Sequence, residues 1–221
     1  MIQVLCGRKS KSAAMLQDKL TALAPELEGW VRWGNQGDGI NGMRKLSGPE
    51  QLDKIAAAGV VVPNHSPSPV LGYVGRDLYH TQGRDIALPH QRQYSNKEWY
   101  VEWVKSFQEW RIHIFNGRSI ARGVKHYVGD KELEYEIRSR RRGWRLRHDI
   151  DPPEAVREAA RKAVLALGYV FGAVDVLVRD PDDVPVVLEV NSAPGLDNYT
   201  ATKYAEAIVR YVKRQRRTAN V

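Results

Sequence analysis

The chain has little cysteine, little phenylalanine and no long apolar segment. Its 221 residues include one cysteine, Cys6, three phenylalanines and three methionines. A single cysteine excludes an internal disulfide, and its place after an apolar run predicts a small buried side chain in a reducing compartment. No apolar run approaches the length that spans a bilayer, and the first residues lack the pattern of a secretory signal. We therefore expect a cytoplasmic protein with no membrane partner.

Positive charge exceeds negative charge. The chain carries 34 Lys and Arg residues against 26 Asp and Glu residues, which gives a net charge of +8. The excess is concentrated in residues 138–147 and 210–217. Such clusters attract phosphates, nucleic acid or an acidic substrate. The second cluster also suits the solvated end of a helix, where the helix dipole favours cations.

Strands alternate with helices near the start of the chain, and strands dominate afterwards. Apolar runs predict strands over 2–6, 30–34 and 60–63, with helices between them, which is typical of a small parallel αβ layer. The proline-rich stretch 64–69 predicts a boundary. We therefore predict three parts, namely an αβ domain over 1–65, a first lobe over 66–105 and a second lobe over 106–221.

The second half of the chain contains clear strand and helix signals. Residues 98–104 and 109–115 alternate as strands do, and Asn116-Gly117 is a tight hairpin signal before a strand over 118–127. The basic stretch that follows has no periodicity and predicts a mobile loop. Residues 151–167 predict an amphipathic helix with Asp151 as its N-cap.

Two acids interrupt the apolar runs of the hairpin predicted over residues 171–198. Asp175 lies in the first run and Glu189 in the second, and the turn-rich residues 179–183 separate the runs. Antiparallel pairing makes the two acids approximate cross-strand neighbours, and Glu189 shares a face with Asn191. Facing acids are destabilising unless something neutralises them. Two carboxylates and an amide oxygen suit Mg²⁺. The alternative interpretation is a solvent-facing hairpin with scattered acids.

The hairpin resembles the ATP-grasp superfamily. The runs DVLV (175–178) and VVLEVNSAPGL (186–196) are similar to the C-terminal metal signature of carboxylate–amine ligases, such as D-alanine:D-alanine ligases and ribosomal-protein glutamate ligases. The resemblance covers about residues 65–215, and the compact size is similar to that of small ATP-grasp proteins of bacteriophages. It implies an α+β fold in which ATP lies between two lobes, behind a short αβ N-terminal domain. It also implies that Asp175, Glu189 and Asn191 bind Mg²⁺, as two ions, with Mn²⁺ as a substitute.

The same resemblance implies nucleotide-binding residues in the first lobe. The strand near residue 100 is similar to the hinge strand that meets adenine, with Glu102 as its acid and Trp103 and Val104 as its backbone contacts. Glu109 matches a second acid, which takes the ribose hydroxyls. The alternative for each acid alone is a solvent-facing strand residue.

Phosphate-binding residues are also implied by the resemblance. Arg76 stands where the family has a lysine, and the segment of Gln82, Gly83 and Arg84 stands where the family has a glycine-rich loop over the phosphates. Here the sequence departs from the family, because the segment has one glycine and an arginine in place of lysine. Arginine keeps the charge and can bind phosphate bidentately.

The catalytic cation is the least defined part of the resemblance. Many D-alanine ligases have an arginine two residues before the first metal-binding acid, where this chain has Ala173. Residues 138–140 are similar to an R-S-N motif of the glutamate ligases, with arginine in place of asparagine. We therefore expect Arg138 to neutralise the transferred phosphoryl group, with Arg142 and Lys125 as further candidates. A generic basic rim is the alternative.

The resemblance implies that a carboxylate attacks the γ-phosphate of ATP and that an amine then displaces phosphate from the acyl phosphate. The expected partners are a small-molecule or peptide carboxylate, acidic if the basic rim binds it, and an amine acceptor. The short N-terminal part implies a minimal substrate site, one completed by a partner, or a homodimer. Two other functions remain open. One is a nucleic-acid-binding module, in which the basic segments and tryptophans bind nucleic acid without a metal. The other is an ATP-grasp kinase that transfers phosphate to a small molecule.

Overall fold

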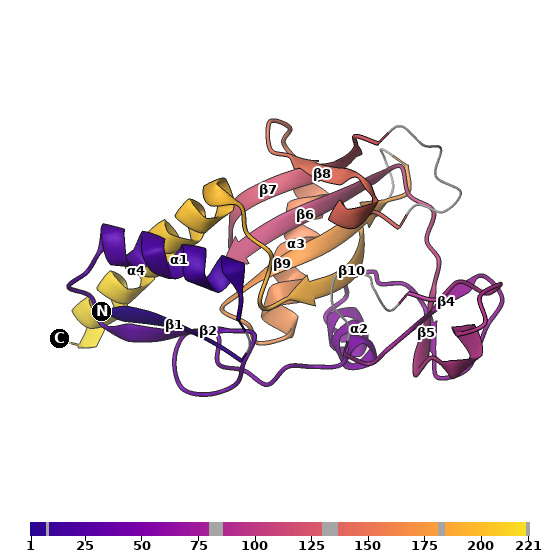
Figure 1. Ribbon diagram of the computed structural model, residues 1–221, viewed down its shortest axis with the longest axis horizontal. Coiled ribbons are helices and arrows are strands. Elements are labelled where there is room, and N and C mark those ends of the chain that lie inside the picture. The colour runs from indigo at the N-terminus through magenta and orange to yellow at the C-terminus, as the bar shows by residue number, and fades with distance from the viewer. Residues whose placement is uncertain (8, 80–85, 130–136, 181–183, 220–221) are drawn as a thin grey trace.

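The computed structural model describes residues 1–7, 9–79, 86–129, 137–180 and 184–219. Its described strands form three separate sheets, and helices pack against them (Figure 1). The result is the mixed α+β architecture that the sequence predicts. Within the described ranges, no helix is both long enough and apolar enough to cross a bilayer.

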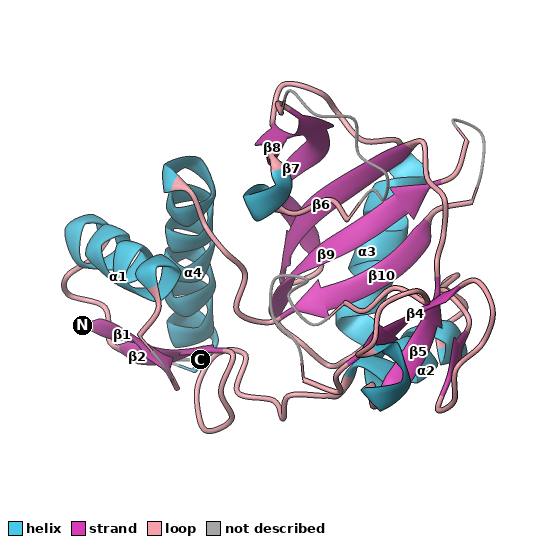
Figure 2. Ribbon diagram, turned by 45° about the vertical axis from the view of Figure 1, so that its right-hand side comes forward, coloured by secondary structure: helices cyan, strands magenta, loops and turns pink. Residues whose placement is uncertain are grey.

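The largest sheet is antiparallel and has the strand order β10-β9-β6-β7-β8. Its strands are β6 (Gln108–Phe115), β7 (Arg118–Tyr127), β8 (Trp144–Arg147), β9 (Phe171–Val178) and β10 (Val186–Asn191). Helix α3 (Glu154–Ala166) covers one face, where Val156, Ala160 and Val164 are fully buried in the main core (Figure 2). Polar side chains gather on the opposite face, because side chains alternate across a strand.

A second, three-stranded sheet lies beside β10. It has the order β3-β5-β4 and consists of β3 (His65–Ser66), β4 (Tyr73–Arg76) and β5 (Trp99–Glu102), with a short 3-10 turn, η1 (Tyr94–Asn96), before β5. Helix α2 (Gly48–Ala57) begins with a capping box between Ser47 and Glu50. Gln51 of α2 accepts a hydrogen bond from the backbone of Val190, so α2 covers the outer edge of β10.

The N-terminal elements form the third unit together with the last helix. Strand β1 (Ile2–Cys6) pairs in parallel with β2 (Gly29–Trp33), and helices α1 (Lys11–Leu23) and α4 (Asn198–Ala219) pack beside them (Figures 1 and 2). Phe171 of the large sheet packs against Trp33 of β2 and edge-to-face against Tyr204 of α4. The first and last parts of the chain therefore share one core, and the limits of the three predicted parts stay a prediction.

Several sequence predictions for this fold are confirmed. Asn116 and Gly117 both have positive φ, 47° and 71°, as a tight hairpin turn requires, and they join β6 to β7. The apolar stripe of α3 faces the core, and Gly168 with φ 69° follows the helix. The hairpin of β9 and β10 also lies where the sequence predicts it, and the basic residues 210–217 lie in the last part of helix α4 (Asn198–Ala219).

Three local predictions are wrong. Residues 60–63 form no strand; Val61 accepts one hydrogen bond from Val187 at the edge of β10. Asp151 does not cap α3, because its carboxylate pairs with Arg122 at 2.7 Å and the N-cap is Pro153. The basic stretch contains the 3-10 turn η2 (Arg140–Arg142) and strand β8, which pairs with β7.

The single cysteine also differs from its prediction. The sequence predicts a buried side chain for Cys6, but Cys6 is only half-buried.

The β6–β7 turn predicts the effect of one substitution. A Cβ added to Gly117 would meet no heavy atom within 4 Å, so Gly117→Ala adds no clash and only forces an alanine into the left-handed region. We expect the free energy of unfolding in urea to fall by about 1 kcal/mol. Gly7→Ala is the matched control, because it also meets open space but without a positive φ, and should change stability by less than half as much. Equal effects of the two variants would contradict the assigned turn.

Candidate functional site

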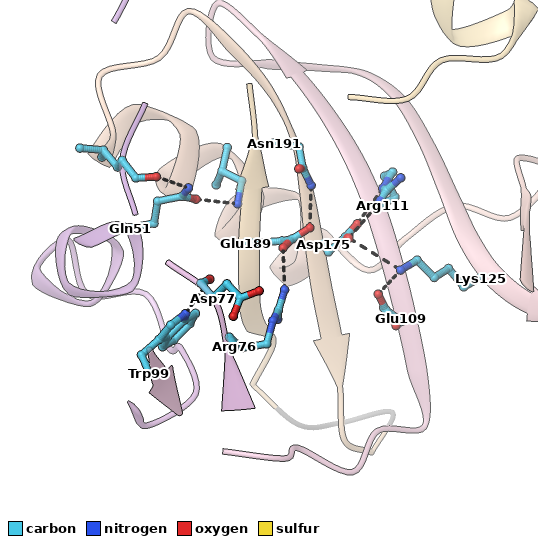
Figure 3. A network of polar contacts seen from close by, with 12 residues as sticks. Gln51, Arg76, Asp77, Trp99, Glu109, Arg111, Lys125, Asp175, Glu189 and Asn191 are labelled. Atoms are coloured by element: carbon cyan, nitrogen blue, oxygen red, sulfur yellow. Dashed lines mark hydrogen bonds and ion pairs between the residues drawn. The ribbon is translucent and has the colours of Figure 1, made fainter. Parts of the chain in front are cut away.

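The hairpin of β9 and β10 brings Asp175 and Glu189 into direct register. The two residues are cross-strand partners, and a β-bulge between Val187 and Glu189 adjusts the pairing (Figure 3). Asn191 lies on the same face and donates a hydrogen bond from Nδ2 to Glu189 Oε1 at 2.8 Å. The predicted facing of the acids and the shared face of Glu189 and Asn191 are therefore confirmed.

Cations from the neighbouring strands neutralise Asp175. Arg111 of β6 is its cross-strand partner and donates two hydrogen bonds to its carboxylate, each at 2.7 Å. Lys125 of β7 lies 3.7 Å from the same carboxylate and also pairs with Glu109 of β6. Three adjacent strands thus contribute a continuous network of two acids and two cations (Figure 3).

Burial makes this network electrostatically strong. Asp175 is 4% exposed and Glu109 is 6% exposed. Burial alone would raise the pKa of Asp175, but Arg111 and Lys125 outweigh it and hold this pKa below its usual range. Burial raises the pKa of Glu109, and the charge of Asp175 adds to that shift although Lys125 opposes it. Asp175 is therefore the ionised acid at the centre of the site.

Glu189 joins the large sheet to the small one. Its Oε2 lies 4.0 Å from the guanidinium of Arg76 at the end of β4 (Figure 3). Asp77, next to Arg76, pairs with Lys97 at 2.9 Å and accepts a hydrogen bond at its carbonyl oxygen from Trp99 Nε1. The end of β4 is thereby held in place, with Arg76 directed at the acids of β9 and β10.

The donor set on the hairpin fits a hard divalent cation. Two carboxylates and one amide oxygen lie on adjacent strands, and oxygen ligands are what Mg²⁺ prefers. Among the residues that the structure describes, no cluster of three or more His, Cys, Asp and Glu side chains forms a metal site, so an amide would have to complete this one. Glu189 is half-buried and reachable, whereas Asp175 shares its oxygens with Arg111.

The other predicted nucleotide residues separate into two places. Glu102 ends β5 and accepts hydrogen bonds from the backbone and side chain of Asn64 at 3.2 and 2.9 Å. Trp103 follows it and donates its backbone N–H to Gly72, while Val104 is half-buried in the connection to β6. Glu109 lies in the network around Asp175, and its role as a second acid for the ribose hydroxyls stays a prediction.

The predicted basic residues also differ in their positions. Arg138 is buried, donates to the carbonyl of Ser106 at 2.8 Å and lies 4.9 Å over the ring of Trp144. Burial raises the pKa of Glu109, and the positive charge of Arg138 opposes that shift, so Arg138 lies near the network. Arg142 is exposed in η2, and Lys125 is inside the network. The three remaining predicted residues lie outside the described residues, namely Gln82, Gly83 and Arg84.

Arg111 and His113 are two residues beside the site that the sequence motifs did not single out. Both lie on β6 on the same face as Glu109, two and four residues away, which the alternation of residues 109–115 already implied. His113 is 1% exposed, and its Nδ1 lies 3.3 Å from the hydroxyl of Tyr204. Burial, with the charge of Arg111, lowers the pKa of His113 to about 3, so the ring is neutral. Burial likewise raises the pKa of Tyr204.

Several solved structures with a similar fold are ligases. The ATP-grasp ligase PsnB with a minimal precursor matches with a TM-score of 0.67 and 10% identity, over 95% of this chain and 98% of its own. The D-alanine–D-alanine ligase of Bacillus anthracis matches with a TM-score of 0.64 and 13% identity, over 99% of this chain and 99% of its own. The macrocyclase MdnC of Microcystis aeruginosa, bound with precursor peptide MdnA, matches with a TM-score of 0.61 and 14% identity, over 95% of this chain and 99% of its own. No protein-family model and no curated protein matches the sequence.

The neutral state of buried His113 predicts a pH effect on stability. The unfolded chain binds a proton at this histidine below about pH 6.5, and the folded chain does so only near pH 3. Stability therefore falls as the pH is lowered between these values, by up to about 1.4 kcal/mol per pH unit. In urea unfolding, the free energy of unfolding should decrease less from pH 7 to pH 5 for His113→Gln than for the unmodified chain. An equal decrease in both proteins would contradict a buried neutral ring at His113.

Proposed function

We propose that this protein, which has the ATP-grasp fold, is an ATP- and Mg²⁺-dependent ligase that joins a carboxylate to an amine. One observation carries the proposal: Asp175, Glu189 and Asn191 meet on one hairpin, with Arg76 of the small sheet directed at them. The fold supports a general ATP-dependent ligase, because the similar solved structures are ligases. Some of those structures contain ATP, or Mg and ADP, which supports the same ligands here.

The residues of the hairpin are the proposed metal ligands. Glu189 and Asn191 would hold the ion with Asp175, whose negative charge Arg111 and Lys125 maintain. When bound, Mg²⁺ neutralises the charge of the phosphate oxygens. Arg76 is the proposed phosphate ligand from the other lobe, since a guanidinium can bind two oxygens at once. Glu102, with the backbone of Trp103 and Val104, is the proposed site for adenine and ribose.

The proposed reaction has two steps. The substrate carboxylate attacks the γ-phosphate, which forms an acyl phosphate and ADP; the amine then attacks the acyl carbon and phosphate leaves. Phosphoryl transfer depends mostly on positioning and on neutralising charge. Arg138 is the proposed cation for the transferred group, because it is buried and its charge reaches Glu109. Arg142 stays a weaker candidate because it is exposed.

The tryptophans argue against the nucleic-acid alternative. Trp99, Trp110 and Trp144 are at most 8% exposed, so their faces are packed in the protein and cannot stack on bases. Trp103 is half-buried against the core of the small sheet. The kinase alternative shares the site residues with the ligase, and only the product separates the two.

The metal assignment predicts the effect of one charge-removing substitution. Glu189→Gln keeps the size of the side chain and one acceptor oxygen but removes the anion. We expect Mg²⁺-dependent ADP release to fall by about a hundredfold to a thousandfold, the usual effect of removing a positioned electrostatic group. Glu158→Gln, on the solvent side of α3, is the control and should keep the original rate. Turnover by Glu189→Gln at the unmodified rate would refute the assignment.

The reaction class can be read from the product. The purified chain is incubated with ATP, Mg²⁺ and pooled amino acids or cell extract, and new masses are identified by mass spectrometry. We expect a condensed product that is lighter than its two substrates together by one water, with formation of ADP and phosphate. A product heavier than one substrate by a phosphoryl group, without condensation, would show a kinase and overturn the ligase proposal.

A further inference from the structure

A groove of about 450 Å³ lies between strand β7 and helix α4, outside the network around Asp175. Its lining includes four cations against one carboxylate, and we call it the β7–α4 groove. The charged residues and the aromatic residue that define it are Arg118, Arg122, Lys203, Arg210, Glu206 and Tyr199. We propose that the β7–α4 groove binds an acidic peptide segment in an extended conformation.

Charge in the groove favours an anionic partner. Glu206 lies 3.7 Å from Lys203 and 3.9 Å from Arg210, and both distances exceed a direct hydrogen bond. Arg122 is compensated by Asp151 at 2.7 Å, whereas Arg118 is exposed at the start of β7. A net positive charge therefore remains in the groove, and carboxylates of a partner could replace water around these cations.

The strand edge in the groove favours a peptide. Strand β8 pairs with Val124–Tyr127 of β7 and not with the first half of β7, which faces the groove. His148 Nδ1 contacts the carbonyl oxygen of Arg122 at 2.5 Å, so this carbonyl already has a partner, and a peptide would pair with the part of β7 before it. A strand edge can pair with the backbone of an extended peptide, while neighbouring side chains recognise the peptide side chains. Nucleic acid has no such backbone pattern of N–H donors and C=O acceptors.

The β7–α4 groove is connected to the candidate site through two elements. Lys125 of the Asp175 network lies on the same strand as Arg122, three residues further on. The ring of Tyr199 packs against that of His148, and His148 Nε2 contacts Asp197 at 3.2 Å, in the segment that follows Asn191. A peptide in the groove would thus lie next to the segment after the metal signature. Its role as a ligase substrate rests on the proposed function, but its binding does not.

Binding can be measured without ATP on the full chain. The probe is a fluorescein-labelled peptide of alternating Glu and Val, followed by fluorescence anisotropy at fixed salt. The double variant Arg118→Glu/Lys203→Glu should bind at least about tenfold more weakly, because two attractions become repulsions. Lys213→Glu/Arg214→Glu changes the net charge equally at exposed positions of α4 outside the groove, and should stay within about twofold of the unmodified chain. Circular dichroism of both variants checks that they fold.

A second probe tests the strand pairing. The same peptide with every backbone nitrogen methylated has the same charge but lacks all backbone N–H donors, and it should bind about tenfold more weakly. Equal affinity for the two peptides would overturn the proposed strand pairing. An equal loss of peptide affinity in both double variants would overturn the β7–α4 groove as the binding site. Stronger competition by an oligothymidylate of the same charge than by unlabelled peptide would assign the groove to nucleic acid instead. Glu189→Gln should keep the original peptide affinity, so failure of the ligase proposal is read from turnover alone.

Discussion

The buried carboxylate of Asp175 and its two cations are the interaction on which the candidate site depends. Moving an ion out of water costs several kcal/mol, so Asp175 stays ionised only because Arg111 and Lys125 flank it. These cations come from two neighbouring strands, and their carboxylate comes from a third. The charges therefore fix the register of the strands that carry the site. In the proposed ligase they also keep Asp175 anionic while a metal ion shares its oxygens.

The fold places the two halves of the site on different sheets. The hairpin of β9 and β10 supplies the acids, and the end of β4 supplies Arg76, which reaches Glu189 across the boundary. Helix α2 and Val61 satisfy backbone groups at the outer edge of β10, so this edge is held although no further strand among the described residues pairs with it. A nucleotide between the sheets would have phosphate ligands from both, which is the arrangement the ligase proposal requires.

Local sequence patterns predicted the parts of the site that lie close together in the chain. The hairpin of β9 and β10 has a turn-rich connection, so the acids could be paired by counting from its midpoint, and Asn191 followed from alternation. The partners of Asp175 could not be found in this way, because Arg111 is 64 residues away and strand order is not visible in a single sequence. Glu109 was assigned from a family spacing, whereas burial beside Lys125 decides its surroundings. Asp151 looked like a cap because the competing Arg122 is distant in the chain.

The central claim is that the hairpin holds magnesium against the phosphates of ATP. A crystal structure with Mg²⁺ and a non-hydrolysable ATP analogue tests it most directly. The account predicts metal–oxygen distances of about 2.1 Å to Glu189 and Asn191, with Asp175 in the same coordination shell and Arg76 on a phosphate. A triphosphate bound elsewhere, with no ion beside Glu189 and with Asp175 still held only by Arg111 and Lys125, would contradict it.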